Sequence, residues 1–234
     1  MRSPRRMTAF RSFWRSDRGL SALLVFLFVA LIVAPPLLRA RIVPPVVFDV
    51  VFALILISGA LTVSARKWPA MLAGAAALLT LGLRFAQRGG WPSGSLAIVD
   101  AVLTVACTAT LAGFVLYRVL RRGEISLDRV AGAVAAYLLL GMAWAAAYHV
   151  VFLMRPDAFR FPEADPDELS LLYYSFVTLT TMGYGDITPV HPAARSLAVS
   201  EALVGQIFPA VLIARLVSME LATRQDRKDR APQN

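Results

Sequence analysis

The sequence is poor in cysteine and in charged residues, and both shortages exclude classes of protein. Its single cysteine, Cys107, lies in an apolar run, so one chain cannot build a disulfide framework or a cysteine metal cluster. No catalytic triad and no phosphate-binding loop is present, so we expect no enzyme activity. Only 17% of the 234 residues are charged and 58% are hydrophobic, with a mean hydropathy of +0.63. This composition is typical of a membrane protein.

The net charge of +9 does not indicate binding to nucleic acid. The arginines and lysines lie between apolar runs and do not form a soluble basic domain with interleaved aromatic residues. We therefore expect no nucleic-acid partner.

Six apolar segments have about the length of roughly 20 residues that a helix needs to cross a bilayer. The third is the weakest, because it is short and contains Gly74 and Gly82. We therefore expect an all-α membrane protein. The predicted spans are residues 19–39, 46–64, 69–85, 96–117, 130–154 and 193–218.

The distribution of positive charge predicts that both termini are cytoplasmic. This orientation places seventeen of the 24 arginines and lysines inside and leaves seven outside, as the positive-inside rule requires. We do not expect the first span to be a cleaved signal peptide, because no small-x-small cleavage pattern occurs near Ala34. We predict a multi-pass protein of the plasma membrane, whose basic N-terminus (1–18) and tail (219–234) suit anionic lipid headgroups.

Between the fifth and sixth spans lies the stretch "TLTTMGYGDITP", residues 178–189. About ten helix-compatible residues precede it, half the length of a span, which predicts a re-entrant half-helix. Gly183 and Gly185 alternate with Met182 and Tyr184. Because glycine adopts left-handed backbone angles at no steric cost, this alternation can turn successive carbonyls toward one axis. A column of carbonyl oxygens can replace the hydration shell of a monovalent cation.

The motif "TTMGYGD" resembles the selectivity filter of potassium channels, and the resemblance covers about residues 130–218. It implies a pore domain of span, half-helix, filter and span, in which the permeating potassium ion is the only small partner and no cofactor is needed. The hydroxyl of Thr181 would add a ligand at the inner end, and Gly185 and Asp186 would form the outer mouth. The implied filter residues are Thr181, Met182, Gly183, Tyr184 and Gly185, of which the first four supply carbonyl ligands.

The resemblance also implies a support around the filter. Tyr173 and Tyr174 occupy the place of an aromatic cuff, although anchoring at the membrane interface is the alternative. Some family members hold the aspartate with an acid on the half-helix, but Val177 occupies that position here. In this chain a tyrosine hydroxyl can form the hydrogen bond to Asp186 instead. The half-helix ends near Thr180, and its negative end favours a cation below the filter. Met182 departs from the more usual Val or Ile.

One chain contains one copy of the motif, and a ring of carbonyls needs four, so the resemblance implies a homotetramer. The predicted function is passive, potassium-selective conduction. The alternatives are a membrane subunit of a coupled cation uptake system and a non-conducting regulatory subunit of another channel.

The sixth span contains four candidate gating or pore-lining residues. Gly205 and Pro209 favour either a hinge or simple helix packing. Glu201 is an ionisable residue inside a span, which makes it a functional candidate, with a hydrogen bond to the half-helix or to a neighbouring chain as the simpler interpretation. Gln206 is expected to share that role.

The first four spans (19–120) have the position of a voltage sensor without its arginines. No arginine occurs between Leu96 and Tyr117, and Asp100 lies there instead. Asp49 and Asp100 are expected either to pair with Arg84 or to be hydrated. The two histidines, at 149 and 191, are expected to be bystanders.

Overall fold

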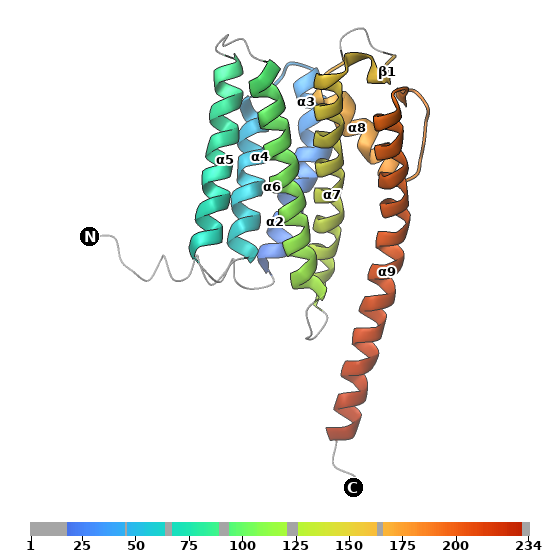
Figure 1. Ribbon diagram of the computed structural model, residues 1–234. Helices are drawn as coiled ribbons and strands as arrows, with labels where there is room; N and C mark the ends of the chain where they lie inside the picture. Colours follow the sequence, from blue (N-terminus) through green and yellow to red (C-terminus); the bar gives the residue numbers. More distant parts are fainter. Residues whose placement is uncertain are drawn as a thin grey trace, which may run out of the picture.

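The computed structural model of the protein describes residues 18–44, 46–63, 67–88, 94–120, 126–162 and 166–230, and most of these are helical (Figure 1). The N-terminal segment 1–17 and residues 231–234, both predicted to contact lipid headgroups, lie outside the described part. The elements in chain order are α2 (Arg18–Phe28), η1 (Val29–Val33), α3 (Ala34–Arg39), α4 (Val46–Val63), α5 (Lys67–Arg88), α6 (Gly94–Leu120), α7 (Leu127–Met154), η2 (Pro156–Ala158), β1 (Phe159–Arg160), α8 (Glu168–Leu179), β2 (Thr188–Pro189) and α9 (Pro192–Arg230).

The described residues of all six segments predicted as spans are helical. Four are long and apolar enough to cross a membrane, which confirms a multi-pass, all-α membrane protein. The helix α4 contributes a shorter apolar stretch, Val46–Gly59, and α5 lies where the third span was predicted. The four helices are Gly19–Arg39, Gly94–Leu120, Leu127–Met154 and Pro192–Met219.

The first membrane helix contains one π-helical turn. This turn, η1, ends at Val33, and Pro35 and Pro36 follow in the first turn of α3, which begins at Ala34. A proline has no N–H to donate and its ring clashes with the carbonyl four residues earlier, so a wider turn before the two prolines relieves that clash. The helix therefore continues from α2 through α3 without a break.

The long helices run side by side, with α8 inserted near one end between α7 and α9 (Figure 1). The helix α7 is the centre of the bundle, because it contacts α2, α6, α8 and α9. Many of its buried residues are alanines and glycines, which allow helices in a membrane to approach closely. The main core lies between α2, α4, α6 and α7.

The half-helix α8 has 12 residues, which corresponds to about 18 Å and to little more than half of a bilayer core of roughly 30 Å. Its start is fixed by a capping box, in which the Ser170 N–H donates to Asp167 Oδ1 at 2.9 Å. A short antiparallel pairing of β1 with β2 connects the chain before α8 to the chain after residues 181–186, the segment that is predicted to be a filter and is called the filter below. The predicted re-entrant half-helix is thus anchored at both of its flanks.

The last helix, α9, has 39 residues and continues through Gly205 and Pro209 without interruption. At 1.5 Å per residue it is about 58 Å long, so it projects well beyond the other helices at the end opposite α8 (Figure 1). The helix also includes most of the segment predicted as a separate tail, up to Arg230.

Candidate functional site

The chain turns back at the C-terminal end of α8. The N–H groups of Met182 and Gly183 both donate to the carbonyl of Val177, at 2.9 and 3.3 Å. These bonds replace the next turn of the helix and start the extended filter segment. The reversal happens where the negative end of the helix dipole lies.

Three residues of the filter segment have positive φ angles. They are Thr181 at 57°, Gly183 at 56° and Gly185 at 78°, so every second residue is left-handed. A Cβ added at Gly183 or Gly185 would meet no atom within 4 Å, so crowding within the chain does not explain these glycines. Their backbone angles do, because a side chain at such angles is strained. The segment has the alternating handedness that a column of carbonyls requires.

The base of the filter is attached to α9. Thr181 is a non-glycine residue with positive φ, an arrangement that costs on the order of 1–3 kcal/mol unless its surroundings hold it. The amide of Gln206 donates to the Thr181 hydroxyl at 3.0 Å. Gln206 thus makes a hydrogen bond at the base of the half-helix, which is one of the two interpretations that it was expected to share with Glu201, and it holds the threonine whose backbone is strained.

The two adjacent tyrosines of α8 have different surroundings. The hydroxyl of Tyr173 donates to Asp186 Oδ2 at 2.8 Å, across the outer end of the filter. This hydrogen bond is the main reason that the pKa of the Asp186 carboxyl lies below its ordinary value. Tyr174 is buried, and its ring packs edge-on against Tyr148 and Phe159. The first tyrosine thus contacts the filter mouth and the second the protein core.

Glu201 is fully buried where α7, α8 and α9 meet. Its Oε2 accepts a hydrogen bond from the Tyr148 hydroxyl at 2.5 Å, and its Oε1 lies 2.5 Å from Ser175 Oγ on α8. Of the two interpretations of Glu201, the hydrogen bond to the half-helix is present within a single chain. Tyr148 and Ser175 were not identified from the sequence, where the only signal was that a buried acid needs polar neighbours.

Gly205 lies where α9 crosses the end of α8. A Cβ built on Gly205 would come within 1.9 Å of the Leu179 carbonyl oxygen. The same oxygen accepts a hydrogen bond from the Tyr137 hydroxyl of α7 at 3.1 Å. This close approach favours packing over a hinge as the reason for the glycine.

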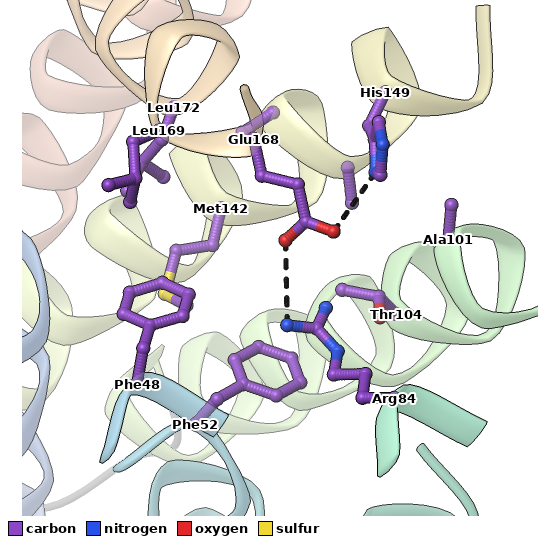
Figure 2. Close-up of a pocket in the computed structure, with 12 residues that line it drawn as sticks. Phe48, Phe52, Arg84, Ala101, Thr104, Met142, His149, Glu168, Leu169 and Leu172 are labelled. Atoms are coloured by element: carbon purple, nitrogen blue, oxygen red, sulfur yellow. Dashed lines mark ion pairs between the residues drawn. The ribbon is translucent and has the colours of Figure 1, made fainter. Parts of the chain in front are cut away.

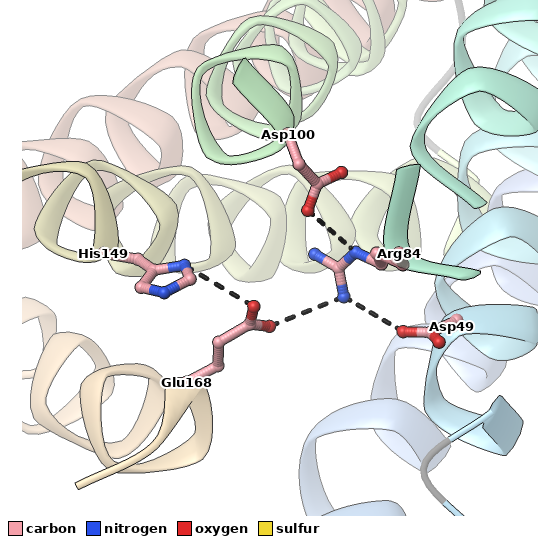
Figure 3. Close-up of polar contacts among 5 residues, drawn as sticks. All are labelled: Asp49, Arg84, Asp100, His149 and Glu168. Carbon is pink, nitrogen blue, oxygen red and sulfur yellow. Dashed lines mark hydrogen bonds and ion pairs between the residues drawn. The ribbon is translucent and has the colours of Figure 1, made fainter. Parts of the chain in front are cut away.

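A cluster of charged residues joins the first helices to α8 (Figure 3). Arg84 of α5 pairs with Asp49 and Asp100 at 3.1 Å each, which is the first of the two alternatives left open by the sequence, and with Glu168 at 3.5 Å. His149, expected to be a bystander, lies 3.5 Å from Glu168. Glu168 is in the first turn of the half-helix, so this cluster reaches the element that ends in the filter.

A cavity of about 50 Å³ adjoins this cluster (Figure 2). Polar side chains of Arg84, Thr104, His149 and Glu168 line one part, and apolar side chains of α4, α7 and α8 line the rest. The cavity is large enough for a few water molecules. It is bordered by residues of α4, α5, α6, α7 and α8.

In the single chain, the residues of the filter and many apolar residues of α9 are exposed. Residues 180–186 are all exposed, as are Val199, Leu203, Ile207 and Val211, which follow one another at helical spacing. These apolar side chains lie on a membrane-spanning helix. Lipid or further protein chains must cover them.

Comparisons with known proteins match the part of the chain that contains this site. A family model described as an ion channel matches residues 134–221, from α7 into the last part of α9. Protein LctB of Bacillus caldotenax is 38% identical over 133 residues, which are 52% of this chain and 92% of that protein. Protein LctB of Geobacillus stearothermophilus is 39% identical over 105 residues, 40% of this chain and 74% of that protein.

A plant protein, two pore potassium channel c of Oryza sativa subsp. japonica, is 40% identical over 86 residues. These are 37% of this chain and 18% of the plant protein, so the similarity concerns a small part of it. No solved structure matches the chain significantly.

Proposed function

The chain belongs to the ion channel family whose model matches residues 134–221, and we propose that it conducts potassium ions passively across the membrane. The observation that carries this proposal is the alternation of left-handed residues at Thr181, Gly183 and Gly185 within "TMGYGD". A turn between two helices needs no such alternation over five residues. A stack of carbonyl ligands does.

In this proposal the permeating ion is the substrate, and the protein supplies oxygen ligands in place of water. The carbonyls of residues 181–184 and the hydroxyl of Thr181 coordinate potassium, and Gly185 completes the filter. Binding must be favourable enough for the ion to enter and weak enough for it to leave, which several equivalent sites in a row provide. The electrochemical gradient drives the flux.

The support of the filter follows from contacts within the chain. Tyr173 holds Asp186 at the outer mouth, and Gln206 holds Thr181 at the inner end. The end of α8 near Thr180 lies beside the inner end and favours a cation there. Both ends of the filter are therefore attached to helices.

The pore is proposed to form from four copies of the chain. A single filter segment offers ligands from one side only, and residues 180–186 are exposed in the single chain. Four such segments around one axis would bury them and complete the coordination. Part of the exposed apolar face of α9 would then face neighbouring copies, and the rest would face the pore or lipid.

The proposed location is the plasma membrane, with six spans and both termini in the cytoplasm. The asymmetry of positive charge supports this orientation. The projecting end of α9 would lie on the cytoplasmic side with the basic tail, in reach of anionic headgroups.

The test is flux through purified protein in liposomes, with potassium and sodium gradients compared. We expect a potassium flux that needs no other protein and no coupled ion, and a much smaller sodium flux. Flux that requires a second protein would identify a subunit of a coupled uptake system. The absence of flux from correctly assembled tetramers would favour a regulatory subunit and would contradict the proposal.

A further inference from the structure

The buried carboxyl group of Glu201 belongs to a chain of short oxygen–oxygen contacts that connects it to α7 and α8. Glu201 Oε2 contacts the Tyr148 hydroxyl at 2.5 Å, and Glu201 Oε1 contacts Ser175 Oγ at 2.5 Å. Ser175 Oγ also lies 2.8 Å from the carbonyl oxygen of Gly141. All three separations have the length of O–H···O hydrogen bonds, so each needs one proton between its two oxygens.

The number of hydroxyl protons available for these three contacts decides whether Glu201 is protonated. The hydroxyls of Tyr148 and Ser175 carry one proton each, and the Gly141 carbonyl can only accept. Ser175 must therefore donate to Gly141, and Tyr148 donates to Glu201 Oε2. The contact between Ser175 and Glu201 Oε1 then has no proton unless the carboxyl group supplies it. An ionised Glu201 would leave two acceptor oxygens 2.5 Å apart.

The charges around Glu201 lead to the same conclusion. Within the part of the chain that the structure describes, no ion pair reaches this carboxyl group. The titratable groups near it are the phenols of Tyr137 and Tyr148 on α7 and of Tyr174 on α8. Burying a carboxylate without a cation costs several kcal/mol, whereas a neutral acid whose two hydrogen bonds, to Tyr148 and Ser175, are both satisfied avoids that cost.

We propose that Glu201 is a protonated carboxylic acid in the folded protein and that it positions α8 by donating a hydrogen bond to Ser175. The acid joins the three helices of the pore domain at one point, because Tyr148 and Gly141 belong to α7 and Ser175 to α8. Ser175 lies four residues before Leu179, where α8 ends and the filter begins. Glu201 is thus a positioning residue for the filter. This consequence rests on the proposed potassium conduction, whereas the protonation itself does not.

The proposal makes glutamine the natural replacement. In Glu201→Gln the amide nitrogen can donate to Ser175 and the amide oxygen can accept from Tyr148, so all three contacts keep their protons. In Glu201→Leu the volume is similar but neither contact can form. If Glu201 were ionised, glutamine would be as poor a replacement as any other, since it would remove the charge.

The first measurement is an infrared difference spectrum between the wild type and Glu201→Gln, in detergent at neutral pH. We expect the wild type to contribute a protonated-carboxyl C=O band that shifts in heavy water and is missing from the variant. A difference confined to carboxylate bands would overturn the proposal. This readout needs no ion flux, so it stands even if the protein does not conduct potassium.

The second measurement is potassium flux in liposomes for the same variants. We expect Glu201→Gln to keep the wild-type flux within about a factor of two, and Glu201→Leu to lose on the order of tenfold, the equivalent of about 1.4 kcal/mol and of one hydrogen bond. If Glu201→Leu fails to assemble, Ser175→Ala replaces it, because it removes the acceptor of the same bond without changing the acid. Equal, large losses in the glutamine and leucine variants would contradict the positioning role of a neutral acid.

Discussion

The close approach of α9 to the end of α8 at Gly205 allows a sharp test of how the filter is held. A Cβ at residue 205 would lie 1.9 Å from the Leu179 carbonyl oxygen, whereas real Cβ contacts essentially never fall below 3.0 Å. In Gly205→Ala, α9 or the end of α8 must therefore move by at least about 1 Å. Neither side can yield by rotating a side chain, since the carbonyl belongs to the backbone.

The displacement would reach the filter directly. Leu179 is the last residue of α8, and Thr181 begins the filter two residues later. Overpacking of this kind costs about 1–3 kcal/mol in each chain. We therefore expect Gly205→Ala to lower both the thermal stability of the assembly and the preference for potassium over sodium in liposome flux.

Gly113→Ala is the matched control, because a Cβ at that helical glycine meets no atom within 4 Å. It should leave stability unchanged or slightly raised, since alanine favours helix by up to about 1 kcal/mol over glycine. If Gly205 is only a hinge, Gly205→Ala will change the open probability but will leave selectivity and stability at wild-type values. That result would refute the packing argument.

Three further predictions concern the filter and the charged cluster. Gly183→Ala, compared with Gly113→Ala, should cost about 1 kcal/mol or more per chain and reduce potassium selectivity in flux assays while the tetramer still assembles. Tyr173→Phe removes the bond that lowers the pKa of Asp186, a stabilisation present at neutral pH and lost on acidification, so inhibition of flux by acid should begin at a higher pH than in the wild type. Arg84→Gln leaves buried carboxylates without their guanidinium partner and should destabilise the protein by about 3–5 kcal/mol in thermal unfolding. Unchanged potassium selectivity in Gly183→Ala would contradict the first prediction, and an unshifted pH dependence of flux in Tyr173→Phe the second. Wild-type thermal stability in Arg84→Gln would contradict the third.

The sequence was sufficient to predict the helices and part of the local backbone geometry between residues 181 and 185. Apolar length predicted the six helical segments, because crossing a bilayer imposes one length on every span. The glycine spacing at 183 and 185 predicted two of the three left-handed residues. The third, Thr181, was not predicted to be left-handed, because nothing in a threonine indicates that conformation; the Gln206 amide on α9 holds it in the folded chain.

Contacts between distant segments were harder to predict. Glu201 was recognised as unusual, but its partners Tyr148 and Ser175 lie 53 and 26 residues away and resemble ordinary helix residues. Gly205 was left between hinge and packing, since the choice depends on how close α9 comes to α8. The sequence shows that a polar residue inside a span requires hydrogen-bond partners and that a glycine can allow a close approach. Only the fold shows which residues are the partners and which backbone approaches the glycine.

The charged cluster also bears on what the first four helices can do. Arg84 is held by Asp49 of α4, Asp100 of α6 and Glu168 of α8, so its charge is fixed from three elements (Figure 3). Moving one charge through the full membrane field yields about 2.3 kcal/mol per 100 mV, whereas breaking a buried pair costs about 3–5 kcal/mol. A membrane potential of ordinary size therefore cannot release this arginine.

From the same comparison we infer that the four-helix unit does not move in response to the membrane potential. Between Leu96 and Tyr117, α6 contains no arginine or lysine, so this stretch offers no positive charge that could move outward. The ion pair from Arg84 to Glu168 instead attaches this unit to the first turn of α8, while Glu201 and Gly205 contact α8 from the side of α9. The half-helix is thus held at its start by the four-helix unit and along its length by α9. Steep voltage dependence of the potassium flux would show that the cluster can rearrange and would contradict this view.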